Sequence, residues 1–150
     1  VVPVVSAKEM YTSCMLKYNE VDVAIMSAAV SDYKPTNVAA QKIKKKTENL
    51  TIKLSPTTDI LSQMGASKTN QFLVGFALET ENELEHALTK LKRKNLDAIV
   101  LNSLNDQGAG FGTSTNKITF IDASLKPKEF ALKPKNEVAV DIITEIIARL

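Results

Sequence analysis

The sequence predicts an α/β fold in which an open, mainly parallel β-sheet carries helices on both faces and one protruding β-arm. Short apolar runs typical of buried strands recur along the chain, and segments with a helical apolar repeat stand between most of them. Parallel neighbours in a sheet require such crossovers, which are right-handed in nearly all folds. A polar, lysine-rich stretch interrupts the alternation once and predicts the arm.

The first predicted elements are a short buried strand, a helix and a longer strand. Residues 1–5 are almost all valine and predict the first strand. Ser6 and Glu9 have the spacing of a capping box, which begins a helix. Residues 23–30 are mostly small and apolar, as expected of a parallel strand buried on both faces. The helix has its apolar positions at Ala7, Met10, Tyr11, Cys14, Met15 and Tyr18.

The predicted arm spans about residues 34–57 and contains two polar strands, 42–46 and 50–54, joined by a turn. A run of lysines on an arm is usually a solvated face, and it can protect an edge strand from aggregation. The arm leaves directly after Asp32, at the end of a strand, so its ammonium groups can also fold over an anionic ligand there. We favour this second interpretation. The run consists of Lys42, Lys44, Lys45 and Lys46.

The rest of the chain continues the alternation of helices and strands. A helix should start within residues 56–59, with Ile60, Leu61 and Met64 as its inner face, and a central strand should follow over 72–76. A second capping box at Thr80–Glu83 opens the next helix, which leads to a third central strand over 97–102; the apolar stripe of that helix is Leu84, Ala87, Leu88 and Leu91.

After a glycine-containing loop we expect a strand pair at 117–122 and 129–132, and then a closing helix that packs on the sheet. The apolar positions of the closing helix are Val138, Ala139, Ile142, Ile143, Ile146, Ile147 and Leu150.

Composition limits the classes of function. With 150 residues, 44% of them hydrophobic, the chain has material for one domain. The net charge of +2 is too small to argue for nucleic acid or a membrane, so an anion site must be local. The one cysteine, Cys14, and the one histidine, His86, exclude an internal disulfide and argue against a thiolate or histidine metal site. Without a membrane-length apolar run or a signal peptide, we expect a cytoplasmic protein.

In a wound sheet, ligands bind outside the carboxyl ends of the strands, here near residues 31–33, 76–80 and 102–106. Asp32 can hold a ribose hydroxyl or a magnesium-bound water, or it can cap a turn. Phe76 can stack on a base, although an aromatic residue that ends a buried strand is more often part of the core. Asn102 can bond a substrate amide or serve as a turn residue.

Two further lysines, Lys90 and Lys94, stand four apart and therefore on one helix face, from which they can reach a polyphosphate. The helix macrodipole alone explains cations at a helix end, and from spacing alone we favour that explanation. The glycine-containing loop at 108–112 matches neither a P-loop nor the dinucleotide fingerprint. Neither a Ser-His-Asp arrangement nor a metal-ligand cluster can be assembled, which leaves electrostatic catalysis on phosphates.

Several ordered motifs together resemble bacterial phosphopantothenoylcysteine synthetase, commonly the C-terminal half of a bifunctional coenzyme A biosynthesis flavoprotein. The resemblance covers essentially all 150 residues and implies a Rossmann-like sheet. Its motifs are Ala28-Ala-Val-Ser-Asp-Tyr-Lys-Pro35, Lys42-Ile-Lys-Lys45, Thr58-Asp-Ile-Leu61, Val74-Gly-Phe-Ala-Leu-Glu-Thr80, Lys94-Asn-Leu-Asp-Ala-Ile-Val100, and Gly110-Phe-Gly112 with Asn116.

The resemblance implies a phosphopantothenate–cysteine ligase. The carboxylate of 4'-phosphopantothenate attacks the α-phosphate of CTP, pyrophosphate leaves, and the amine of cysteine then displaces CMP from the acyl-cytidylate. Magnesium accompanies the nucleotide. By the same resemblance, Lys42 is the catalytic arm lysine. The residues that bind CTP are Asp32, Lys42, Thr58, Asp59, Ile60, Phe76, Lys90 and Lys94, and those that bind the substrate are Ala28 and Asn102.

The resemblance also carries expectations about partners and completeness. It implies a homodimer formed through the arm, and fusion to or association with a flavin-dependent phosphopantothenoylcysteine decarboxylase; we expect no FMN in this chain. The family begins with a strand, a glycine-rich turn and a Ser-Gly segment that help bind the acyl intermediate. These do not occur in the sequence, so we expect the N-terminal part of the usual domain to be absent and this piece alone to be inactive. Ser103 and Ser114 stand where the family commonly has Asp.

Two other functions fit a similar sheet. A nicotinamide-dependent oxidoreductase domain would need a glycine fingerprint and an acidic ribose partner about 20 residues later, and neither occurs in the sequence. A nonenzymatic interaction subunit could use the basic arm to contact a partner protein. Titration with CTP and magnesium separates the second alternative from the ligase, because a docking module takes up no nucleotide.

Overall fold

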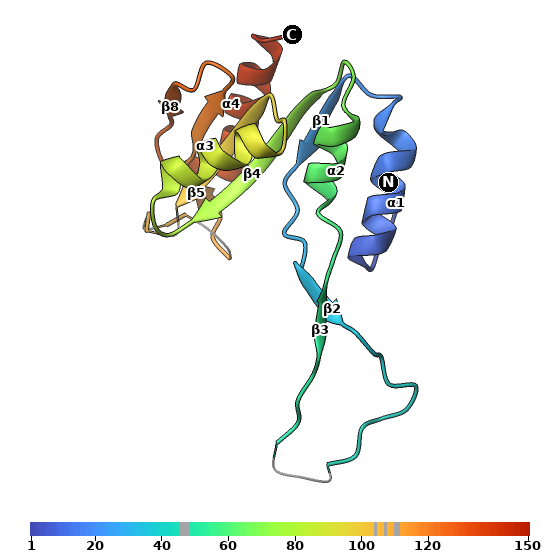
Figure 1. Ribbon diagram of the computed structural model, residues 1–150. Coiled ribbons are helices and arrows are strands. Elements are labelled where there is room, and N and C mark those ends of the chain that lie inside the picture. The colour runs from blue at the N-terminus through green and yellow to red at the C-terminus, as the bar shows by residue number, and fades with distance from the viewer. Residues whose placement is uncertain (46–48, 104, 107, 110–111) are drawn as a thin grey trace.

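A computed structural model describes residues 1–45, 49–103, 105–106, 108–109 and 112–150 (Figure 1). The helices are α1 (Ala7–Tyr18), α2 (Ile60–Ser67), α3 (Glu83–Arg93) and α4 (Lys135–Ile147). The strands are β1 (Val23–Met26), β2 (Tyr33–Pro35), β3 (Leu54–Pro56), β4 (Phe72–Glu79), β5 (Ala98–Ser103), β6 (Thr115–Asn116), β7 (Thr119–Asp122), β8 (Pro127–Glu129) and β9 (Lys133–Pro134).

The main sheet has five strands in the order β1-β4-β5-β7-β8. β1, β4 and β5 are parallel, with Ala24 opposite Leu73 and Val74 opposite Ala98, whereas β7 pairs antiparallel with both of its neighbours, β5 and β8. The predicted α/β fold is confirmed, but the sheet is mixed. The reason lies in the connections: helices link the parallel strands, and a short turn at Leu125 joins β7 to β8.

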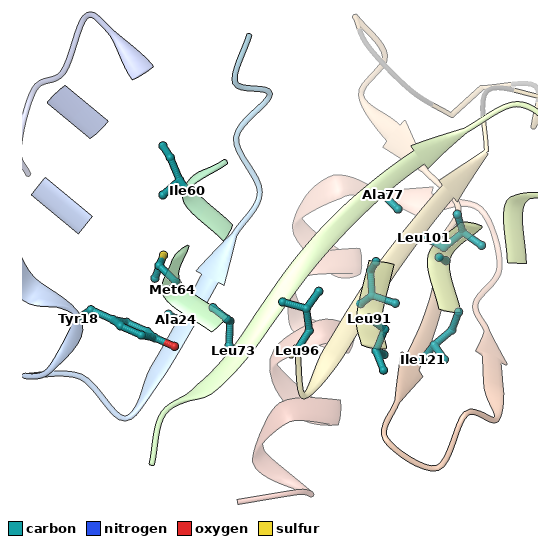
Figure 2. Close-up of a cluster of buried hydrophobic side chains, with 12 residues drawn as sticks. Tyr18, Ala24, Ile60, Met64, Leu73, Ala77, Leu91, Leu96, Leu101 and Ile121 are labelled. Atoms are coloured by element: carbon teal, nitrogen blue, oxygen red, sulfur yellow. The ribbon is translucent and has the colours of Figure 1, made fainter. Parts of the chain in front are cut away.

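Helices cover both faces of the sheet, as expected. Successive residues of a strand point to opposite faces, so Leu73 and Ile99 belong to the cluster beneath α1, α2 and α3, while their neighbours Val74 and Val100 pack against α4. Figure 2 shows the first of these two buried clusters, which Tyr18 joins from α1. The parallel strands are thereby held rigidly, and the polar groups that follow them have fixed positions.

The capping box that starts α1 is confirmed, since the Ser6 Oγ accepts from Glu9 N at 3.2 Å and a Glu9 carboxylate oxygen accepts from Ser6 N at 3.3 Å. The strand predicted over residues 1–5 is wrong, because Val1 and Val5 are fully exposed and none of the described strands pairs with this segment. Valine-rich composition favours a strand only where a neighbouring backbone supplies the hydrogen bonds.

β1 is shorter and less buried than the sequence predicts. It ends at Met26 instead of residue 30, and within it only Ala24 is buried. β1 pairs with β4 alone among the described strands, so it is an edge strand and Ile25 is 37% exposed. The apolar pattern of residues 23–30 shows that the segment fits a sheet, but it does not reveal how many neighbours the strand has.

The second predicted capping box, unlike the first, does not form. Asn82, at φ 45°, occupies the N-cap of α3 and makes no side-chain cap bond. The predicted cap residue, Thr80, follows β4 directly, and its carbonyl accepts a hydrogen bond from Asn105 at 2.9 Å. β4 extends three residues beyond the predicted end at residue 76, which places the start of the helix at Glu83.

The arm extends away from the sheet (Figure 1). β2 and β3 pair antiparallel at its base, and hydrogen bonds from Thr36 N to Lys53 O (2.9 Å) and from Thr57 N to Asp32 O (2.8 Å) flank them. The strands predicted over 42–46 and 50–54 do not form in the described part of these ranges, apart from Leu54, where β3 begins. Side chains there such as Ile43 are exposed, so nothing packs against the alternating residues to hold them in a sheet. Lys46 lies outside the described residues.

The closing helix, α4, packs through one narrow face. Val138, Ile142 and Ile146 are buried against the sheet. The prediction that the other apolar positions also pack on the sheet is wrong: Ile143 and Ile147 are exposed, as are Ala139 and Leu150. A helix on one face of a sheet buries a single stripe, and these residues fall outside it.

Candidate functional site

A cavity of about 160 Å³ lies where the carboxyl end of β1 and the middle of β4 meet the base of the arm and the start of α2. Of the ten predicted site residues, this cavity brings seven together. They reach it from segments far apart in the sequence, which is the arrangement expected at the carboxyl edge of a wound sheet. The seven are Ala28, Asp32, Thr58, Asp59, Ile60, Phe76 and Lys94.

Asp59 is the N-cap of α2 and the charged centre of the cavity wall. Its Oδ1 accepts from Ser62 N at 3.0 Å, and its Oδ2 lies 2.9 Å from the Lys94 ammonium. Burial raises the pKa of Asp59, but the hydrogen bonds from Lys94 and Ser62 outweigh it, so the pKa lies below its ordinary value. Asp59 is therefore ionised at neutral pH and holds Lys94, whose side chain is only 14% exposed.

Lys94 owes its position to a close contact between α2 and the end of α3. A Cβ added to Gly65 would lie 1.8 Å from the Lys94 carbonyl oxygen, so only glycine allows this approach. Asn95 follows with φ 52°, and its side-chain amide donates to the Gly65 carbonyl at 2.9 Å. Sequence reasoning missed both contributions. An Asn directly after a helix is a signal for a left-handed terminus, but it does not identify the partner.

The base of the arm places Asp32 next to the start of α2. The Asp32 carbonyl accepts from Thr57 N, and the Thr57 hydroxyl donates to the Ser31 carbonyl at 2.6 Å. The Asp32 side chain is exposed at the cavity. The cavity thus contains a solvated carboxylate near the lysine–carboxylate pair.

Part of the remaining wall is apolar. Met10, Met26 and Ile60 line the cavity together with Phe76. Phe76 is half-buried and also packs against the cluster beneath α4, as the core interpretation predicts. Its contact with a base stays a prediction. A wall of this kind can accept the flat, partly apolar ring of a nucleobase while the charged side takes its phosphates.

Three predicted residues do not line the cavity. Lys42 is exposed on the arm. The Lys90 ammonium lies 2.5 Å from a carboxylate oxygen of Glu79. The Asn102 side-chain oxygen, near the end of β5, accepts from the side-chain amide of Asn116 in β6 at 3.2 Å. The cavity thus has one of the three predicted lysines in its wall.

Within the described residues, no three His, Cys, Asp or Glu side chains form a group able to hold a metal ion. The helices of the described segments are also too short or too polar to cross a membrane.

A family model described as the DNA/pantothenate metabolism flavoprotein C-terminal domain matches residues 1–150. The chain belongs to this family. The resemblance drawn from the sequence motifs is thereby confirmed, and the cavity described above is a feature of a flavoprotein C-terminal domain.

Curated members of the family match nearly the whole chain. The chain is 40% identical over 147 residues to the coenzyme A biosynthesis bifunctional protein CoaBC of Bacillus subtilis, covering 98% of the chain and 36% of that protein. It is 51% identical over 148 residues to a cysteine/cysteine sulfinic acid decarboxylase of an unknown prokaryotic organism, covering 98% of the chain and 41% of that protein. The chain therefore spans about two fifths of the length of these relatives.

Solved structures agree with the fold. The crystal structure of the C-terminal domain of a CoaBC protein is 38% identical, with a TM-score of 0.78 over 99% of the chain and 66% of that structure. A Cab2 variant described as a complex with phosphopantothenate-cysteine has a TM-score of 0.76 at 22% identity, over 99% of this chain and 51% of its own. At that identity the second likeness supports the fold alone.

Proposed function

We propose that the chain is the CTP-binding domain of a phosphopantothenate–cysteine ligase of coenzyme A biosynthesis. The observation that carries the proposal is the Lys94–Asp59 pair in the wall of a cavity that also contains Thr58, Ile60 and Phe76. A nucleoside triphosphate needs cations for its phosphates and an apolar surface for its base. Membership of the flavoprotein family and the 40% identity to a bifunctional CoaBC protein support the assignment to coenzyme A biosynthesis.

The proposal places the nucleotide in the cavity in one orientation. Its base packs on Phe76 and Ile60, and its phosphates meet Lys94, with Lys90 one helical turn away. Asp32 is exposed at the cavity and supplies one carboxylate, which suits Mg²⁺ because this ion usually takes one or two protein carboxylates and completes its shell with phosphate oxygens and water. The magnesium then arrives with CTP as part of the substrate, and bound there it offsets phosphate charge.

The chemistry that follows is electrostatic. A carboxylate oxygen of 4'-phosphopantothenate forms a bond to the α-phosphorus of CTP, and the bond to the bridging oxygen breaks with release of pyrophosphate. The amine of cysteine then attacks the acyl carbon, the acyl–oxygen bond breaks, and CMP leaves. Negative charge develops on phosphate oxygens in the first step, and positioned ammonium groups stabilise it. We assign this role to Lys42, delivered by the arm, and substrate contacts to Ala28 and Asn102.

The proposal includes partners. The flavoprotein family and the bifunctional relatives support a link to a flavin-dependent phosphopantothenoylcysteine decarboxylase. We also propose a homodimer formed through the arm, where exposed apolar residues such as Ile43 and Leu54 stand among lysines. FMN has no role in this chain under the proposal, and the location is cytoplasmic.

Calorimetric titration with CTP and Mg²⁺ tests the nucleotide site on this chain. The proposal predicts saturable binding, and the absence of nucleotide heat would instead favour a docking module. The catalytic role of Lys42 needs the complete protein, in which Lys42→Gln should abolish pyrophosphate release from CTP and phosphopantothenate while the fold survives. Pyrophosphate release near the wild-type rate would remove Lys42 from the mechanism. Lys53→Gln, a second lysine of the arm, is the matched control.

A further inference from the structure

Glu79 is the last residue of β4, and its carboxylate is almost enclosed by α3. One of its oxygens lies 2.5 Å from the Lys90 ammonium and the other 3.4 Å from Nδ1 of His86. The Glu79 side chain is only 13% exposed. Burying a carboxylate is unfavourable unless charged or hydrogen-bonded partners satisfy it, and here the Lys90 ammonium does so.

His86, Lys90 and Lys94 recur at steps of four along α3 and its C-cap, so their side chains lie on one face. Lys94 is held at the cavity by Asp59. Lys90 lies four residues earlier, about 6 Å away along the helix axis. Each lysine thus has its own carboxylate on a neighbouring element. Asp59 fixes the lysine that lines the cavity, and Glu79 fixes the next lysine on the same face.

We propose that Glu79 is a positioning residue that holds the Lys90 ammonium in place for the phosphates of the nucleotide bound beside Lys94. The proposal rests on the proposed CTP site. An ammonium has three donors, and among the described residues Lys90 has a side-chain partner for one of them, Glu79. The others are left for phosphate oxygens. A lysine already held by Glu79 loses less side-chain freedom when the nucleotide binds.

The helix macrodipole accounts for cations near the end of α3, but not for a largely buried carboxylate at the end of β4 that meets them. A structural ion pair is the competing explanation. A structural pair would stabilise the junction of β4 and α3. In that case the effects of removing Glu79 and of removing Lys90 on nucleotide affinity would be independent of each other. The two explanations therefore differ in the coupling between these residues.

A double-mutant cycle measures that coupling through the calorimetric Kd of CTP–Mg²⁺. We expect Glu79→Gln to weaken binding about fivefold, Lys90→Ala to weaken it at least as much, and the double variant to bind no more weakly than Lys90→Ala. Multiplicative losses, or unchanged or tighter binding by Glu79→Gln, would overturn the proposal. Glu85→Gln, an exposed glutamate on the same helix, is the matched control and should bind like the wild type.

A second measurement separates this proposal from the CTP proposal. Limited acetylation followed by peptide mass spectrometry reports the reactivity of each lysine without nucleotide, with exposed Lys92 as the internal reference. We expect Glu79→Gln to raise the acetylation of Lys90 at least threefold relative to that of Lys92. An unchanged ratio of Lys90 to Lys92 acetylation would refute the claim that Glu79 holds the Lys90 ammonium in place. If the ratio rises but the protein binds no CTP, Glu79 positions Lys90 as proposed, whereas the proposed nucleotide site is wrong.

Discussion

Lys94 and Asp59 form an ion pair that joins the end of α3 to the start of α2, with 2.9 Å between the ammonium and the nearer carboxylate oxygen. The pair brings together residues 35 positions apart and sets the charge at the wall of the cavity. A phosphate that enters must share the Lys94 ammonium with Asp59. The cavity therefore presents a positioned cation, which is the feature that a triphosphate site needs.

Lys94→Ala should weaken CTP–Mg²⁺ binding at least tenfold, a loss of about 1.4 kcal/mol, because the positioned cation disappears from the cavity wall. Isothermal titration calorimetry measures the effect. Lys92→Ala removes an exposed lysine two residues away and should leave the affinity unchanged. Equal affinities of Lys94→Ala and the wild type would return Lys94 to a purely structural role.

Gly65→Ala should destabilise the protein by about 1–3 kcal/mol, because the new methyl group overlaps the Lys94 carbonyl and forces α2 and α3 apart. Denaturant unfolding measures the free energy. Gln63→Ala, at an exposed position of the same helix, should stay within about 0.5 kcal/mol of the wild type. The close contact between the helices would be disproved by a Gly65→Ala variant as stable as Gln63→Ala.

Acid should destabilise the fold through Asp122 and Glu145, which Arg149 bridges at 2.5 and 3.0 Å. A hydrogen bond from Ser124 and the contact with Arg149 lower the pKa of Asp122. Lys128 and Arg149 lower the pKa of Glu145. Burial opposes both shifts.

Because the folded-state pKa values are depressed, this stability is complete above the unfolded values near 4 and is lost as the pH falls through the folded values. The free energy of unfolding should therefore fall from pH 6 to pH 3, and less steeply in Asp122→Asn. Equal slopes for the variant and the wild type would contradict this assignment.

Tyr18→Phe should leave stability unchanged or raise it slightly. The Tyr18 ring is 2% exposed, and its hydroxyl has no hydrogen-bond partner among the described residues. An unsatisfied buried hydroxyl opposes folding, so its removal loses no bond. Thermal unfolding measures the effect. A loss of more than about 1 kcal/mol would show that the hydroxyl makes a hydrogen bond in solution.

The sequence predicted those parts of the fold whose signals are local. The Ser6–Glu9 capping box, the Asp59 helix start and the apolar strands around Val74 and Val100 all depend on neighbouring residues and are present in the structure. Most of the predictions that failed depend on distant partners. Among the described residues, 1–5 have a strand composition but no pairing strand, and the arm pairs at its base. The Thr80–Glu83 capping box failed although its signal is local, because β4 continues to Glu79.

The site divides in the same way. Residues quoted in the motifs, such as Thr58 and Phe76, do line one cavity. The contacts that place Lys94 there were not predictable, because Gly65 and Asn95 meet only after α2 and α3 have packed. Glu79 stood within a motif, yet its partner Lys90 lies eleven residues away on another element.

The most direct test of the central claim, that this cavity binds CTP, is a titration of the ¹⁵N-labelled chain with CTP–Mg²⁺ followed by backbone amide NMR. The account predicts saturable shift changes concentrated at residues 58–61, at Phe76 and at Lys94, with smaller changes at Asp32. No change at saturating nucleotide, or changes confined to residues away from the cavity, would contradict it.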